Sequence, residues 1–109
     1  MPWLVAGDRV VASLEVADTA RARRRGLLGR DGIEGALLLT PARSVHTIRM
    51  RFAIDVAHLD DDMTVLSVVT MAPWRVGRWH RRARHVLEAE AGTMRHWGIE
   101  PGMQIDVRS

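Results

Sequence analysis

The chain has 109 residues, enough for one compact domain over residues 1–109 and too few for two. Hydrophobic residues make up 47% and charged residues 27%, which is typical of a globular domain, and no apolar run approaches the ~20 residues that a membrane helix needs. The net charge is only +3 although all 16 basic residues are arginine, so the charge balance does not indicate a nucleic-acid partner, and the absence of cysteine excludes disulfides, thiolate metal sites and cysteine nucleophiles.

The N-terminal stretch MPWLVAGDRVV has no basic start, and charged residues at positions 8 and 9 interrupt its apolar run. A secretory signal would combine a basic start with an unbroken apolar core, so we expect a cytoplasmic protein. Residues 3–16 are rich in Val and Leu and alternate imperfectly between apolar and polar types. This pattern predicts two strands joined around Gly7 and Asp8.

A helix is predicted to follow, from about residue 20 to about residue 28. Asp18 or Thr19 can cap its N-terminus, because a short side-chain oxygen accepts a hydrogen bond from an unpaired backbone N–H. Ala and Arg, which make up ARARRR, are good helix formers. Gly26 or Gly29 is expected to end the helix, since glycine adopts the left-handed conformation that terminates helices.

Buried strands are predicted in the middle of the chain. ALLLT, residues 36–40, is a short apolar run that Pro41 stops. From residue 48 to residue 56, apolar side chains stand at the even positions and arginine or aspartate at most odd ones, which is the alternation of a strand with one buried face. Three aspartates at 60–62 then favour a turn, and MTVLSVVTM is predicted to return as the partner strand of a hairpin.

The C-terminal part alternates short strands with turns. WRVGRWHRRARH lacks periodicity and is predicted to be an irregular loop, and HVLEAE a strand. Residues from about 92 to about 97 are predicted to form a short helical turn, and MQIDV a closing strand. Strands, one main helix and further strands predict an α+β domain with a mostly antiparallel, barrel-like sheet.

Four segments in this order, ADTARARRRGLLGR, HTIRMRFAIDVAHLDDDMTVLSV, APW and VLEAEAGTMRHWGIEPGMQI, resemble the domain of unknown function 192 family of bacteria and archaea. The resemblance covers roughly residues 17–107 and implies a compact, sheet-rich α+β fold, with no agreed reaction. Three charged positions match the family pattern: Arg23 in RRRGLL, Asp55 in AIDVA and Glu88 in VLEAEAG. The segment HTIRM, residues 46–50, departs from the Trp-Met-x-Asn-Thr of many members, so this surface has a changed chemistry.

Arg23, Asp55 and Glu88 form the first candidate site. In a wrapped sheet both faces can be covered, and a carboxylate there needs partners because an unpaired buried charge is costly. A structural interpretation pairs Arg23 with one of the two carboxylates, which would fix how the helix docks. A functional interpretation makes the same residues the floor of a polar pocket, with arginine as a forked anion donor and aspartate as an acceptor.

A second candidate is the polar side of the predicted strand. Simple alternation points Thr47, Arg49 and Arg51 in one direction, with His46 beside them. Such a group could receive an anion or a small polar molecule, and a solvated strand face is the plainer interpretation. These four residues and the three of the first candidate are the predicted binding residues.

No complete catalytic constellation is found. The five histidines have no metal-ligand spacing and are interpreted as half-exposed side chains in loops and at strand ends, so no metal or cofactor is predicted. We therefore expect a non-enzymatic binding or accessory module for a small polar or anionic ligand of unknown identity. An enzyme that uses Asp55 or Glu88 as acid/base is one alternative. Weak nucleic-acid binding by ARARRR and the arginine-rich loop is another, against which the net charge argues.

Overall fold

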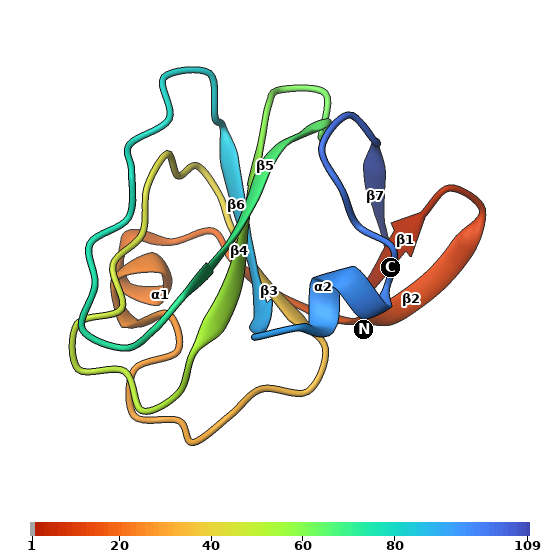
Figure 1. Cartoon of the computed structure of the whole chain (residues 1–109). Helices are drawn as coiled ribbons and strands as arrows, with labels where there is room; N and C mark the ends of the chain where they lie inside the picture. Colours follow the sequence, from red (N-terminus) through yellow and green to blue (C-terminus); the bar gives the residue numbers. More distant parts are fainter. Residues whose placement is uncertain (1) are drawn as a thin grey trace.

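The computed structural model describes residues 2–109, which fold into one mixed β-sheet with two short helices (Figure 1). The spatial order of its strands is β5-β4-β6-β3-β2-β1-β7, and every neighbouring pair is antiparallel except β2 with β3. The strands are β1 (Trp3–Ala6), β2 (Arg9–Ala17), β3 (Ala36–Leu39), β4 (Ile54–Leu59), β5 (Val65–Met71), β6 (His85–Glu90) and β7 (Ile105–Arg108).

The two ends of the sheet approach each other without closing it. Just before β5 and β7, Thr64 and Gln104 form an isolated antiparallel bridge, and the N–H of Val65 donates to the carbonyl oxygen of Met103 at 2.8 Å. Strands β5 and β7 themselves stand at opposite ends of the strand order. The predicted α+β class with mostly antiparallel pairing is therefore confirmed, whereas the barrel-like closure is not confirmed.

Both helices are short. Helix α1 (Ala20–Arg25) is capped by Thr19, whose side chain accepts from the N–H of Ala22 at 3.1 Å, and it ends at Gly26 with φ 48°. It is shorter than the predicted 20–28 because Gly26 leaves the helical conformation first. Helix α2 (Thr93–His96) falls within the predicted 92–97. No helix in residues 2–109 has the length and apolar character to cross a membrane.

The strand predicted from residue 48 to residue 56 is wrong in its first two thirds. Strand β4 begins only at Ile54, and residues 48–53 form turns and bends, with Arg49 at φ 66°. The N–H of Met50 donates to the carbonyl oxygen of Thr47 at 3.0 Å, which closes a turn. Met50 is still buried, so the apolar periodicity reflects a folded-back loop that inserts side chains into the core rather than an extended strand.

Apolar side chains cover both faces of the central strands. One face packs against the α1 side, where Leu27 and Ile54 belong to one buried cluster. The other face packs against α2, β1 and β7, where Leu87 and Met94 belong to a second cluster. All six residues of β4 are buried. A polar side chain on the neighbouring β4 and β6 is therefore removed from water on either face, and it needs a partner.

Thr47 anchors the folded-back loop to the segment that follows β5. Its side chain is fully buried; Oγ1 donates to the carbonyl oxygen of Ala72 at 2.6 Å and accepts from the N–H of Arg75 at 2.8 Å. The Thr47 N–H also donates to the Arg75 carbonyl oxygen at 2.7 Å. These hydrogen bonds fix the position of His46, the preceding residue, relative to the sheet.

Replacing Thr47 with valine keeps the side-chain volume and removes the Oγ1 hydrogen bonds to Ala72 and Arg75. We expect the Thr47→Val variant to lose about 2 kcal/mol of unfolding free energy, because the backbone groups of Ala72 and Arg75 lose their partner. Urea denaturation followed by tryptophan fluorescence measures the loss. A variant within about 0.5 kcal/mol of wild type, the usual range for surface substitutions, would contradict the anchoring role.

Candidate functional site around Glu88

Glu88 is a carboxyl side chain in the middle of the sheet. It lies on β6 between Val56 of β4 and Leu37 of β3, and it is 3% exposed. No hydrogen bond to its carboxyl group is formed within residues 2–109. Burial raises the pKa of Glu88 to about 7. The residue is therefore close to half protonated near neutral pH.

A small cavity of about 40 Å³ separates Glu88 from α1. This volume is enough for water and is far below the roughly 300–1,000 Å³ of an ordinary ligand pocket. The cavity is lined by residues 23–28 at the end of α1, together with Leu39, His46, Met50 and Glu88. The carboxyl of Glu88 thus has room for one small group.

Arg23 lines this cavity without pairing with a carboxylate. Its guanidinium donates to the carbonyl oxygen of Thr40 at 3.2 Å. The ion pairs within residues 2–109 lie elsewhere, between Arg30 and Glu15 at 2.7 Å and between Arg51 and Asp31 at 3.1 Å. The predicted ion pair of Arg23 with Asp55 or Glu88 is not formed.

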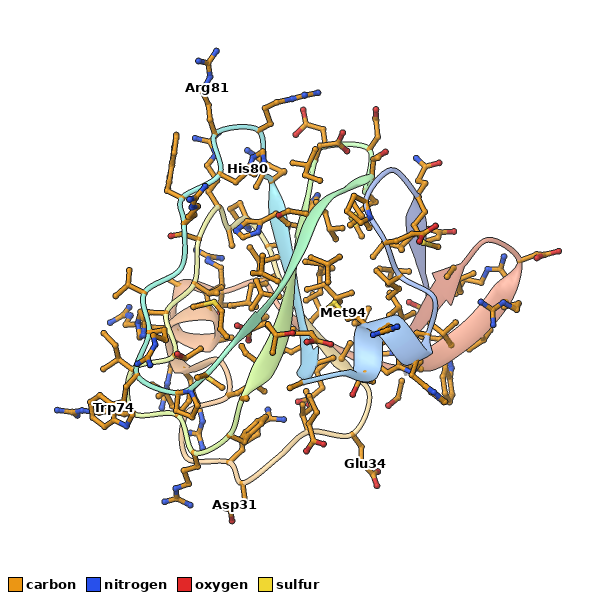
Figure 2. The ribbon with its side chains drawn as sticks, viewed as in Figure 1. Asp31, Glu34, Trp74, His80, Arg81 and Met94 are labelled. Atoms are coloured by element: carbon orange, nitrogen blue, oxygen red, sulfur yellow. The ribbon has the colours of Figure 1, made fainter. Side chains whose placement is uncertain are left out.

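Asp55 lies on the opposite face of the sheet from Glu88. On β4 it stands opposite Ala89, the neighbour of Glu88, and successive residues of a strand point to opposite faces. Thr70 Oγ1 donates to its Oδ1 at 2.7 Å, and the N–H of Met94 donates to its Oδ2 at 3.1 Å. Figure 2 shows Met94 between α2 and the strands. Asp55 therefore holds the first turn of α2 against the sheet.

The remaining predicted binding residues separate into two groups. His46 joins Arg23 and Glu88 at the cavity, and its Nδ1 accepts from the N–H of Ile48 at 3.3 Å. Thr47 is committed to the anchoring hydrogen bonds. Arg49 and Arg51 are exposed, because the segment turns where a strand was predicted. The structure thus brings together Arg23, His46 and Glu88.

A wider cleft of about 670 Å³ adjoins the Glu88 cavity and shares Arg23, Arg24 and Leu39 with it. We call it the arginine cleft; its charged and aromatic lining consists of Arg23, Arg24, Arg43, Arg84 and Trp79. Arg43 Nε donates to the carbonyl oxygen of Ala83 at 3.1 Å, and its guanidinium lies 5.7 Å from the Trp79 ring centroid. The sequence did not predict this cleft, because its arginines come from three separate segments.

A third polar cluster surrounds His58, which is buried rather than half-exposed as predicted. Its Nδ1 lies 3.2 Å from Ser67 Oγ, and its Nε2 has no hydrogen-bond partner within the described chain. Burial and, to a smaller extent, His80 lower the pKa of His58, while the backbone carbonyls of Arg78 and Arg43 act in the opposite direction. The ring therefore stays neutral over a wider pH range than a free histidine.

The fold and these clusters define a class: a small α+β domain with a curled sheet, a buried carboxyl on one face and an arginine-lined opening beside it. The chain belongs to the domain of unknown function 192 family, described as "Uncharacterized ACR", whose family model matches residues 3–107. The resemblance seen in the sequence is thereby confirmed. Membership assigns no activity.

Curated relatives agree with this assignment. A UPF0127 protein of Pyrococcus abyssi is 28% identical over 98 residues, covering 85% of this chain and 84% of the relative. A UPF0127 protein of Pyrococcus horikoshii is 30% identical over 84 residues, covering 72% of this chain and 73% of the relative.

The solved structures support the fold alone. A crystal structure of a protein of unknown function from Novosphingobium aromaticivorans aligns with a TM-score of 0.83 at 21% identity, covering 96% of this chain and 83% of that chain. A structure from Sinorhizobium meliloti, provisionally described as a transcription regulator, aligns with a TM-score of 0.82 at 20% identity and covers 97% of this chain and 91% of that chain. The fold of the chain is therefore one that experiment has already shown.

The raised pKa of Glu88 predicts a pH-dependent stability. A carboxyl whose folded pKa lies above its unfolded value of 4.5 stabilises the fold fully below pH 4.5, and this contribution is lost as pH rises through about 7. The side chain of Glu88→Gln cannot ionise. We therefore expect the unfolding free energy of this variant, relative to that of wild type, to increase by about 3 kcal/mol from pH 4 to pH 8. Urea denaturation across this range measures the difference.

Glu90→Gln is the matched control, because Glu90 lies two residues further along the same strand and is exposed. Its unfolding free energy should follow that of wild type across the pH range. Parallel curves for wild type and Glu88→Gln would show that the Glu88 carboxyl is solvated in solution.

Asp55 gives a contrasting prediction. We expect Asp55→Ala to destabilise the protein by about 3 kcal/mol, because it leaves the buried Met94 N–H and the Thr70 hydroxyl without their charged acceptor. Thr70→Val removes one of these two hydrogen bonds and should cost about half as much. Hydrogen exchange at Met94 reports whether α2 loosens. An Asp55→Ala protein as stable as wild type, with Met94 still protected, would contradict this role.

Proposed function

We propose that this chain is a small-molecule binding domain whose ligand places one hydrogen-bonding group against Glu88. The observation that carries the proposal is a carboxyl group that is almost fully buried and has no hydrogen-bond partner within residues 2–109. Buried polar groups in folded proteins are nearly always hydrogen-bonded. A ligand donor at Glu88 would remove the cost of burying this group.

The cavity restricts the ligand group. About 40 Å³ suits a small group such as a hydroxyl or an amino group and is far below the volume of an ordinary ligand pocket. The rest of the ligand must lie outside, in the adjoining arginine cleft that shares Arg23, Arg24 and Leu39. His46 and Arg23 line the same cavity as Glu88 and can form further hydrogen bonds with the ligand.

An enzyme that uses Glu88 as acid/base is the second candidate function. A pKa of about 7 matches what general acid/base catalysis near neutral pH requires, and His46 lines the same cavity. The first alternative, Asp55, is already engaged by Thr70 and Met94. Binding is favoured over catalysis because, within residues 2–109, neither His46 nor Arg23 forms a hydrogen bond with Glu88 that would make a catalytic pair.

The variant Glu88→Leu distinguishes a ligand-binding role of Glu88 from a structural role. We expect Glu88→Leu to raise the unfolding free energy at pH 8 by about 1–3 kcal/mol, because an apolar side chain replaces an unpaired buried polar group. The same change should abolish ligand binding. Small molecules that co-purify with wild type, extracted and identified by mass spectrometry, should be absent from this variant.

Glu90→Gln again serves as the control and should retain the co-purified molecule. A Glu88→Leu protein that is less stable than wild type would assign Glu88 a structural role and overturn the proposal. So would a ligand that this variant retains at wild-type occupancy. Turnover of the identified ligand that depends on Glu88 would instead support the enzyme.

A further inference from the structure

We infer that the arginine cleft binds a phosphate ester, with the phosphate among its arginines and the organic part toward Trp79 and Glu88. This inference rests on the proposed function and specifies the chemical class of the ligand. It is carried by the four arginines of the cleft, by the hydrogen bonds that hold two of them and by the volume of the space between them.

The charged side chains that line the cleft are all positive. No carboxylate is among the residues that line it, and none of its four arginines takes part in an ion pair within residues 2–109. Guanidinium groups around one space repel one another, and a bound anion offsets this repulsion. A carboxylate is satisfied by one bidentate arginine, whereas a phosphate dianion with three acceptor oxygens matches several.

Three aspartates lie near the cleft, on the side of Arg43 and Arg84. Asp60, Asp61 and Asp62 line a neighbouring cavity that also contains these two arginines. Asp60 Oδ1 accepts from the backbone N–H groups of Asp62 and Thr64 at 2.9 and 3.0 Å. Within residues 2–109 none of the three aspartates forms an ion pair with an arginine of the cleft, and Arg23 and Arg24 do not line the neighbouring cavity.

Two of the arginines are held in place before any ligand arrives. Arg23 donates one terminal nitrogen to the carbonyl oxygen of Thr40, and Arg43 donates Nε to the carbonyl oxygen of Ala83. Both terminal nitrogens of Arg43 remain available to a ligand. The guanidinium carbon lies 5.7 Å from the centroid of the Trp79 ring, and this cation–π contact restricts the orientation of the guanidinium plane. Arginines that are already ordered lose less conformational entropy on binding.

The dimensions suit a small molecule. A volume of about 670 Å³ lies in the usual range of ligand pockets, roughly 300–1,000 Å³. Trp79 is 60% exposed and offers a ring face to an organic group. Because Arg23 and Arg24 line both the cleft and the Glu88 cavity, one ligand can present its phosphate to the arginines and a hydroxyl or amino group to Glu88.

Phenyl phosphate and benzoate are the probes, because they share an aromatic ring and differ in the charge and oxygen count of the anionic group. We expect isothermal titration calorimetry at fixed ionic strength and pH 8 to show phenyl phosphate binding at least about tenfold more tightly than benzoate. The double variant Arg43→Gln/Arg84→Gln should weaken phenyl phosphate at least about tenfold, because it removes charge-assisted hydrogen bonds inside the cleft.

Arg81→Gln/Arg82→Gln is the matched control, with the same change in net charge. Both residues are exposed and lie outside the arginine cleft, and Figure 2 shows Arg81 projecting away from the protein. This variant should bind phenyl phosphate within about twofold of wild type. Equal weakening by the two double variants would reveal general surface attraction and overturn the inference. Equal affinity for the two probes, or tighter binding of a single-stranded RNA than of phenyl phosphate, would also overturn it.

Glu88→Leu distinguishes this inference from the proposed function. Phenyl phosphate carries no donor for Glu88, so its affinity should be unchanged in that variant. Phenyl phosphate binding that needs Arg43 and Arg84 but is indifferent to Glu88 supports the cleft, even if Glu88 proves structural. Failure of phenyl phosphate to bind wild type overturns the phosphate inference and leaves the Glu88 proposal to its own co-purification test.

Discussion

Apolar packing on both faces of the central strands is the constraint on which the rest of the structure depends. Every residue of β4 is buried, and its neighbour β6 is buried over most of its length. Polar side chains on the buried part of these strands are consequently removed from water, whichever face they point to. Each one must either be satisfied by the fold or remain unsatisfied at a cost in stability.

Asp55 and Glu88 meet this constraint in opposite ways. Asp55 receives a hydroxyl from β5 and a backbone N–H from the first turn of α2, so its carboxylate fastens the helix to the sheet. Glu88 lies on the opposite face of the sheet, where it faces apolar side chains and a small cavity, and burial raises its pKa to about 7. The carboxyl groups of these neighbouring strands thus differ in their surroundings, because hydrogen-bond donors surround Asp55 whereas Glu88 borders a small cavity.

The Glu88 cavity and the arginine cleft are neighbouring spaces that share Arg23, Arg24 and Leu39. The loops before β4 and before β6 supply the other charged side chains. The Pyrococcus relatives and the Novosphingobium aromaticivorans structure carry no named activity. The proposed ligand site rests on the combination of an arginine-lined cleft with a buried carboxyl that accepts no hydrogen bond within residues 2–109.

The sequence by itself determined the α+β class, a helix capped by Asp18 or Thr19 and stopped by Gly26 or Gly29, and the hairpin of β4 with β5, because these depend on local composition and periodicity. Four segments in order gave the resemblance to the family. Arg23, His46 and Glu88 were three of the seven predicted binding residues. The sequence pattern was misleading for residues 48–53, since burial of Met50 in a turn produces the same alternation as a strand. Only the tertiary structure decided that Asp55 and Glu88 face opposite sides and that Arg43 and Arg84 join Arg23. Strand register and loop packing set these relations between residues far apart in the chain, and no local pattern records them.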